Sequence, residues 1–175
     1  MRENIILIGM PASGKSTVGV VLAKALGYDF VDTDLLIQRE KKARLEDIIS
    51  REGNEAFLET EERVCCALSP VCTVIATGGS VVYSEKAMKH FKEIGKVVYL
   101  KVEYETLKNR LHDLKARGVV LPEGVSLQGL YEERTILYEQ YADITVDESG
   151  LGLEATMAKT KEMLLAFQES VIKKE

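Results

Sequence analysis

The strongest chemical signal is a glycine-rich run near the N-terminus that fits the pattern GxxxxGK[ST] at every fixed position. It follows a dense apolar segment at 4–9 and precedes apolar residues at helical spacing over 15–26, which is the strand–loop–helix setting that the motif requires. Backbone N–H groups of such a loop point at a bound phosphate. We therefore predict that Mg·ATP binds at Gly9, Met10, Pro11, Ala12, Ser13, Gly14, Lys15, Ser16 and Thr17.

Two residues of this loop have roles that follow from their chemistry. Lys15 is expected to neutralise the β- and γ-phosphates as a catalytic residue, and Ser16 to offer its hydroxyl to Mg²⁺. Motifs of GTPases are missing, because no DxxG is followed by an NKxD, and 175 residues are too few for a motor or a large ATPase. The remaining class is a small kinase that passes the γ-phosphoryl group to a bound acceptor.

Two carboxylates, Asp32 and Asp34, follow a second strand-like segment at 28–31. In an open parallel sheet, ligands bind beyond the carboxyl ends of the strands. Asp32 is expected to hold the Mg²⁺ shell, through water. Asp34 is expected to accept a hydrogen bond from the acceptor hydroxyl and to orient or deprotonate it. The alternative for both is that they cap the following helix.

The apolar periodicity alternates between short strands and longer helices. Strands are predicted at 4–9, 28–31, 73–76, 96–102 and 143–146, and helices at 15–26, 35–51 with a break near 41–45, 55–68, 85–93, 104–114, 127–141 and 154–167. This order predicts an α/β fold with three layers, in which helices cover both faces of a five-stranded parallel sheet. We expect one P-loop kinase domain over 1–175, with a lid at about 114–125, where Gly118, Pro122 and Gly124 replace the periodicity.

Composition excludes several classes of protein. The 23 Lys and Arg residues against 28 Asp and Glu residues give a formal net charge of −5, which is unfavourable for coating nucleic acid. No apolar run reaches the ~20 residues that span a bilayer, and the N-terminus does not resemble a signal peptide. We expect a cytoplasmic monomer whose partners are ATP and a small-molecule acceptor, with no nucleic acid and no membrane.

Several further blocks, in order, resemble the shikimate kinase family, a group of small P-loop kinases. The resemblance covers roughly residues 5–146 and includes the Asp32-Thr33-Asp34 run. The other blocks are Gly53-Asn54-Glu55-Ala56-Phe57 with Glu61, Val74-Ile75-Ala76-Thr77-Gly78-Gly79, Val97-Val98-Tyr99-Leu100, and Arg134 with Leu137-Tyr138 and Ala142-Asp143-Ile144.

The resemblance implies ATP-dependent phosphorylation of a small hydroxy acid, with shikimate or a relative as the acceptor. Arg134 matches the arginine that binds the substrate carboxylate, by a bidentate pair. Arg117 matches a catalytic lid arginine that reaches the transferring phosphates, and Arg110 matches one that lies against the adenine. Gly78, Gly79 and Ser80 match the substrate-binding loop. For Arg134 the alternative is a solvated surface position, and for Gly78 and Gly79 it is a tight strand exit.

Other positions depart from the family pattern and concern the acceptor. Leu58 stands where the family has a second carboxylate-binding arginine, Asn54 replaces a glutamate, and Ser80 replaces a glycine. Loss of one arginine predicts an affinity for an acid acceptor that is lower by about one to two powers of ten. We therefore expect weak or absent activity on shikimate unless another cation, such as Arg51, reaches the pocket. Two alternatives stay open: a paralogue that phosphorylates a different small alcohol (an amino-acid alcohol or a polyol), and a non-catalytic nucleotide-binding module.

Overall fold

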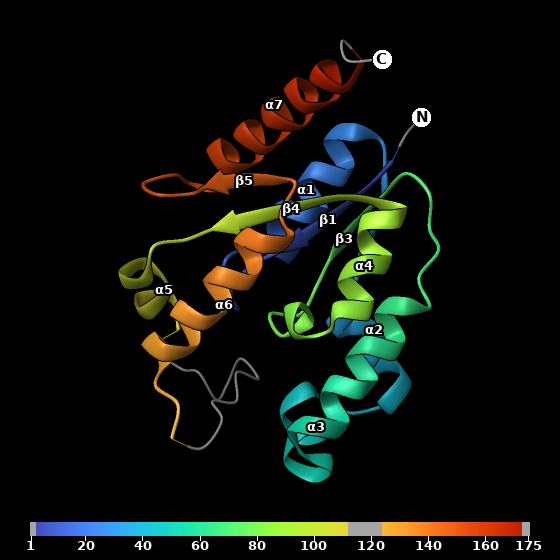
Figure 1. Cartoon of the computed structure of the whole chain (residues 1–175), viewed down its shortest axis with the longest axis vertical. Coiled ribbons are helices and arrows are strands. Elements are labelled where there is room, and N and C mark those ends of the chain that lie inside the picture. Colours follow the sequence, from blue (N-terminus) through green and yellow to red (C-terminus); the bar gives the residue numbers. More distant parts are fainter. Residues whose placement is uncertain (1–2, 112–123, 173–175) are drawn as a thin grey trace.

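The computed structural model describes residues 3–111 and 124–172 (Figure 1). Its sheet has five parallel strands in the order β2-β3-β1-β4-β5 within these ranges. The strands are β1 (Asn4–Ile8), β2 (Asp29–Asp32), β3 (Thr73–Ala76), β4 (Gly95–Lys101) and β5 (Ile144–Asp147). The helices are α1 (Lys15–Leu26), α2 (Thr33–Lys41), α3 (Leu45–Cys66), α4 (Glu85–Ile94), α5 (Tyr104–Arg110), α6 (Leu127–Tyr141) and α7 (Leu153–Ile172), with a 3₁₀ turn η1 (Val81–Tyr83). The predicted α/β class and parallel sheet are confirmed.

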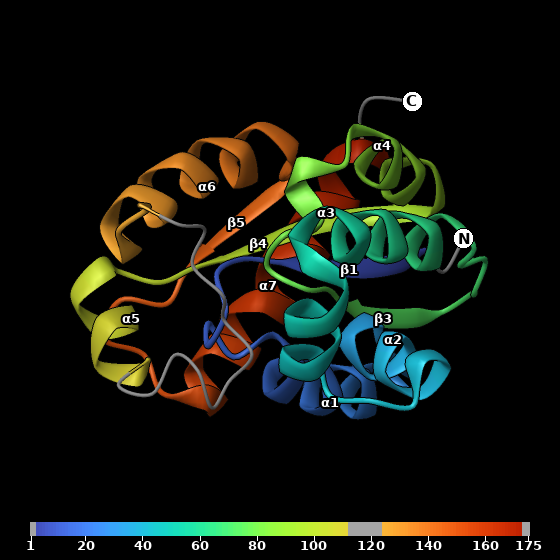
Figure 2. The same cartoon turned by 90° about the horizontal axis from the view of Figure 1, so that it is seen from below.

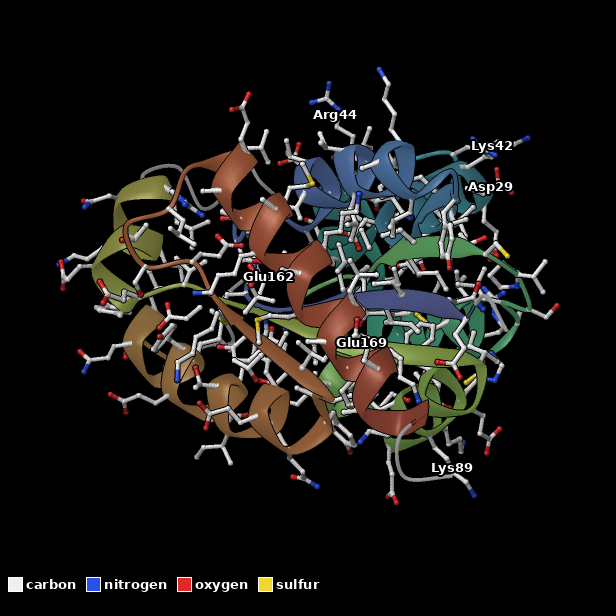
Figure 3. All side chains as sticks on the ribbon, turned by 90° about the horizontal axis from the view of Figure 1, so that it is seen from above. Asp29, Lys42, Arg44, Lys89, Glu162 and Glu169 are labelled. Carbon is white, nitrogen blue, oxygen red and sulfur yellow. The ribbon has the colours of Figure 1, made fainter. Side chains whose placement is uncertain are left out.

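The central strand β1 is buried on both faces, and alternate residues belong to different cores. Ile6 and Ile8 pack with α4 and α6, whereas Ile5 and Leu7 pack with α1 and α7. Figure 2 shows α4 and α6 on one side of the strands and α1 on the other. This two-sided burial explains why the strand is a continuous apolar run in the sequence. The exposed face of α7 includes Glu162 and Glu169 (Figure 3).

Local chemistry sets the limits of several helices. The C-cap of α1 is Gly27 in the left-handed conformation (φ 67°), which satisfies the last carbonyls of the helix. The break predicted near 41–45 lies between α2 and α3, where Lys42 has φ 50°. Gly53 interrupts α3 with φ 86° and ψ 168°, as expected for a glycine that separates two helical segments.

A few boundaries differ from the sequence-based prediction. The helix α2 begins at Thr33 rather than at residue 35, so that Asp34 lies in its first turn. The turn η1 was not predicted, and α7 extends beyond the predicted 154–167 at both ends. Most of the predicted lid at 114–125, including Arg117, lies outside the described residues. None of the helices in the described ranges is long and apolar enough to cross a membrane.

Candidate active site

The glycine-rich loop leaves β1 and ends at α1, as the motif predicts. Gly9 has φ 148°, and a Cβ there would lie 2.7 Å from the carbonyl oxygen of Leu100 on β4, so the loop passes too close to the sheet for a side chain. Gly14 is the N-cap of α1 in the left-handed conformation (φ 93°), and no side chain caps this helix end. The N–H groups of its first turn are therefore available to an anion.

Lys15 lies beneath the loop and is buried. Its ammonium group donates hydrogen bonds of 2.8 Å to the carbonyl oxygens of Gly9 and Met10. Burial lowers the pKa of Lys15 to about 8, and nearby Asp34 partly opposes this effect. Like Asp34, a phosphate bound in the loop would stabilise the charged form of Lys15.

Asp32 joins the loop to the next helix. One carboxylate oxygen accepts a hydrogen bond of 2.6 Å from the Ser16 hydroxyl. The other accepts from the backbone N–H groups of Asp34 and Leu35 at 3.0 and 3.3 Å and so caps α2. The capping alternative is therefore present together with an arrangement of oxygen atoms that suits Mg²⁺.

The carboxylates of Asp34 and Glu61 both lie against Gly78. A Cβ on Gly78 would lie 2.1 Å from Glu61 Oε1 and 2.8 Å from Asp34 Oδ1, so only glycine fits between them. Both of these oxygens are buried and have no hydrogen-bond partner within the described part of the chain. Burial, reinforced by Asp32, raises the pKa of Asp34 to about 6. Burial likewise raises the pKa of Glu61 to about 7, although the Ser80 hydroxyl donates to it at 2.6 Å.

Arg134 projects from α6 towards the phosphate loop and is buried. Its Nε donates to the hydroxyl of Tyr83 at 3.2 Å, and its guanidinium carbon lies 5.1 Å from the centre of the Tyr83 ring. Gly79 provides space beside it, because a Cβ there would lie 3.2 Å from Arg134 Nη1 and 2.7 Å from Pro11. The Tyr138 hydroxyl fixes the Gly79 carbonyl at 2.6 Å.

Arg110 is the last residue of α5 and contacts the phosphate loop. Its Nη1 lies 3.3 Å from the Ala12 carbonyl oxygen and 3.5 Å from Glu148 Oε2. The Glu148 side chain is almost fully buried, and its other oxygen has no hydrogen-bond partner among the described residues. Burial raises the pKa of Glu148 to about 6, and Arg110 partly opposes this effect.

One cavity of about 750 Å³ brings most of the predicted residues together. Among the predicted site residues it is lined by Pro11, Ala12, Ser13, Gly14, Lys15, Ser16, Thr17, Asp34, Gly78, Gly79, Ser80, Arg110 and Arg134. Gly9, Met10 and Asp32 do not line it, since Met10 belongs to the core and Asp32 lies behind Ser16. Leu58 forms part of the wall. Arg51 does not reach the cavity, because its exposed side chain pairs with Glu52 at 2.8 Å.

The cavity residues that sequence reasoning missed include Tyr83 and Glu148. Glu148 follows directly after β5, so the rule that ligands bind beyond the carboxyl ends of parallel strands would have found it. No sequence signal marks Tyr83, which lies in the unpredicted turn η1.

Because Glu61 is buried and its pKa is raised, the free energy of unfolding should depend on pH. Between about pH 4.5 and about pH 7 the unfolded chain has lost the Glu61 proton while the folded protein keeps it, so the free energy of unfolding falls as pH rises. The full effect is on the order of 3 kcal/mol. We expect Glu61→Gln to remove most of this fall, measured as urea unfolding at pH 4.5 to 7.5. Asp34 and Glu148, whose pKa values burial raises to about 6, add falls of the same sign that Glu61→Gln leaves in place.

Glu62→Gln is the matched control for this experiment. Glu62 is the next residue on α3, and its carboxylate accepts hydrogen bonds from Ser84 and Lys86 at the surface, which lower its pKa. This variant should keep the pH dependence of the wild-type protein. Parallel curves for the wild type and Glu61→Gln would show that Glu61 does not hold its proton in the folded state.

A parallel sheet that presents a phosphate loop and a buried carboxylate to one cavity defines the class of P-loop kinases that act on small molecules. The shikimate kinase family model matches residues 11–165. A shikimate kinase of Moorella thermoacetica is 37% identical over 98% of this chain and 99% of its own length. One of Gloeobacter violaceus is 40% identical over 85% of each chain. The chain belongs to the shikimate kinase family.

The fold agrees with this assignment. A solved shikimate kinase of Acinetobacter baumannii, in complex with shikimate, superposes with a TM-score of 0.84 at 32% identity, covering 95% of this chain and 94% of the other. The shikimate kinase of Aquifex aeolicus superposes with a TM-score of 0.81 at 31% identity, over 96% and 98% of the two chains.

Proposed function

We propose that this protein transfers the γ-phosphoryl group of ATP to a hydroxyl group of shikimate. The observation that carries the proposal is the buried Oδ1 of Asp34, which has no hydrogen-bond partner among the described residues and lies in a cavity that the phosphate loop also lines. The chain that holds it belongs to the shikimate kinase family. An acceptor hydroxyl is the partner that this carboxylate oxygen lacks. A relative of known structure binds shikimate, which offers such hydroxyl groups.

Asp34 acts in this proposal as the general base. Its pKa of about 6 leaves it ionised at neutral pH and able to take the hydroxyl proton. The hydroxyl oxygen then forms a bond to the γ-phosphorus, the bond from that phosphorus to the bridging oxygen breaks, and ADP leaves. Lys15 stabilises the charge on the phosphates, with the N–H groups at the start of α1.

Ser16 and Asp32 are the residues that would hold Mg²⁺. The fit rests on their oxygens, which lie 2.6 Å apart at the edge of the phosphate loop. Held there, the metal would supply positive charge that neutralises the charge developing on the phosphates. Asp32 keeps its contact with the N-terminus of α2 and would hold the metal through water.

The other predicted site residues contact the acceptor, the adenine or the phosphates. Arg134 binds the acceptor carboxylate, and Gly78, Gly79 and Ser80 form the backbone wall beside it. Arg110 lies against the adenine. Arg117 and the lid at 114–125 close over the phosphates. These two roles rest on the sequence alone. We also propose a single domain that works as a monomer, which sedimentation of the free enzyme would test. The cytoplasmic location expected from the sequence stays a prediction.

The second candidate is phosphorylation of a different small alcohol, which Leu58 favours because an apolar wall replaces a cation. An acceptor screen separates the two: ADP release with Mg·ATP and shikimate, quinate, homoserine, gluconate or inositol. We expect the highest kcat/KM with shikimate, at a raised KM. A higher value with another acceptor would overturn the shikimate assignment, and ADP release with none of them would favour the nucleotide-binding module.

A further inference from the structure

The guanidinium group of Arg134 is oriented by one neighbour, Tyr83. The Tyr83 hydroxyl accepts the hydrogen bond from Nε, and the guanidinium carbon lies over the Tyr83 ring. The terminal nitrogens Nη1 and Nη2 have no hydrogen-bond partner or ion pair within 3–111 and 124–172. Arg134 therefore keeps the fork that binds a carboxylate in two parallel hydrogen bonds.

Tyr83 keeps a proton of its own to donate. Its hydroxyl accepts from Arg134, and burial raises its pKa, so the group stays protonated at neutral pH. Glu133, the neighbour of Arg134 on α6, also faces this hydroxyl and raises the same pKa. In the free protein Glu133 is the competing acceptor for the Tyr83 proton. The Tyr83 side chain lines the cavity and is 38% exposed, so a bound molecule can reach it.

The cavity has few cations for an anionic acceptor. Its cations in the described part of the chain are Lys15, Arg110 and Arg134. Lys15 is bound to the phosphate loop and Arg110 lies beside Glu148. Leu58 offers no donor, so Arg134 is the one cation left for the acceptor among the described lining residues.

We propose that Tyr83 is a specificity-determining residue whose hydroxyl donates a hydrogen bond to the acceptor carboxylate that Arg134 binds, and that it thereby supplies the second donor that Leu58 lacks. This inference rests on the proposed function, because it takes shikimate, a carboxylic acid, as the acceptor. A neutral hydroxyl next to a guanidinium binds an anion less strongly than a second arginine does. The arrangement thus retains activity on an acid acceptor at a raised KM.

The variant Tyr83→Phe tests the proposal, because phenylalanine keeps the ring on Arg134 and removes only the hydroxyl. We expect the KM for shikimate to rise about ten-fold, with kcat and the KM for ATP changed by less than about two-fold. Tyr131→Phe is the matched control. It removes a hydroxyl on α6 that donates to the Val102 carbonyl outside the cavity, and it should leave all three constants unchanged.

Two further arms separate a contact with the carboxylate from a structural role. The methyl ester of shikimate lacks the charged carboxylate, so its inhibition constant should be the same for the wild type and Tyr83→Phe. Adding Leu58→Arg to Tyr83→Phe should lower the KM for shikimate about ten-fold again, whereas Leu58→Arg alone should lower it less, since both groups bind the same carboxylate.

Each contrary result has a distinct meaning. An unchanged KM for shikimate in Tyr83→Phe overturns the inference while the proposed function stands. Equal losses with shikimate and its methyl ester, or no rescue by Leu58→Arg, assign Tyr83 a structural role and also overturn it. A wild-type protein that does not phosphorylate shikimate overturns the proposed function, and the inference with it.

Discussion

The substitution Lys15→Met is expected to lower kcat by about 10³-fold while the protein stays folded. Methionine retains an unbranched apolar stem in the buried position but removes the ammonium group that would stabilise charge on the β- and γ-phosphates. The carbonyl oxygens of Gly9 and Met10 lose a donor, so the free energy of unfolding should also fall by about 1 to 3 kcal/mol. Steady-state ADP release and urea unfolding measure the two effects.

Lys24→Met is the matched control for this substitution. Lys24 lies on the same helix, α1, in its last turn, and is exposed. We expect wild-type kinetics for it. A Lys15→Met variant that keeps kcat within about ten-fold of the wild type would show that the loop does not hold the transferring phosphate.

Asp34→Asn is expected to lower kcat by about 10² to 10⁴-fold with little change in the affinity for ATP. The amide cannot take the proton of the acceptor hydroxyl, whereas the nucleotide contacts are made elsewhere. In the wild type, activity should rise with pH through about 6, because the raised pKa of Asp34 keeps the base protonated below that value. The residual activity of Asp34→Asn should lack this rise. Turnover from pH 5 to 8 and calorimetric binding of ATP are the measurements.

Asp32→Asn provides the contrast. Its carboxylate touches Ser16 and caps α2, so this variant should need more Mg²⁺ for half-maximal activity and should lose about 1 kcal/mol of stability. Equal effects of the two substitutions on nucleotide affinity would contradict the division between a metal residue and a base.

Much of the fold could be predicted because its signals are local. Helix α1, strand β3 and helix α6 lie at the residues predicted, since each has apolar residues at one clear period and ends at a glycine, a polar cap or a strand. The start of α2 was missed because its cap is Asp32, which the sequence also marks as a ligand. The turn η1 has three residues, too few for any periodicity.

Some parts of the candidate site could likewise be predicted from local sequence signals, and others could not. The phosphate loop could be located from the sequence, because one contiguous run of residues provides both the backbone cradle and the lysine. Asp34 could be placed at the acceptor side, since strands of a parallel sheet end at one edge. The sequence shows that Leu58 stands where the family has a cation. It does not show that Tyr83 lies beside Arg134.

The amino-acid sequence by itself determined the strand–loop–helix phosphate cradle, the order of strands and helices, and the resemblance to the shikimate kinase family. Only the tertiary structure decided which groups share the acceptor end of the cavity. Ser80 meets Glu61 across 19 residues, and Arg134 meets Tyr83 across 51. Such pairs depend on how helices pack on the sheet. Burial then shifts their pKa values, and the pKa of Glu61 rises to about 7 because the fold withdraws its carboxyl group from water.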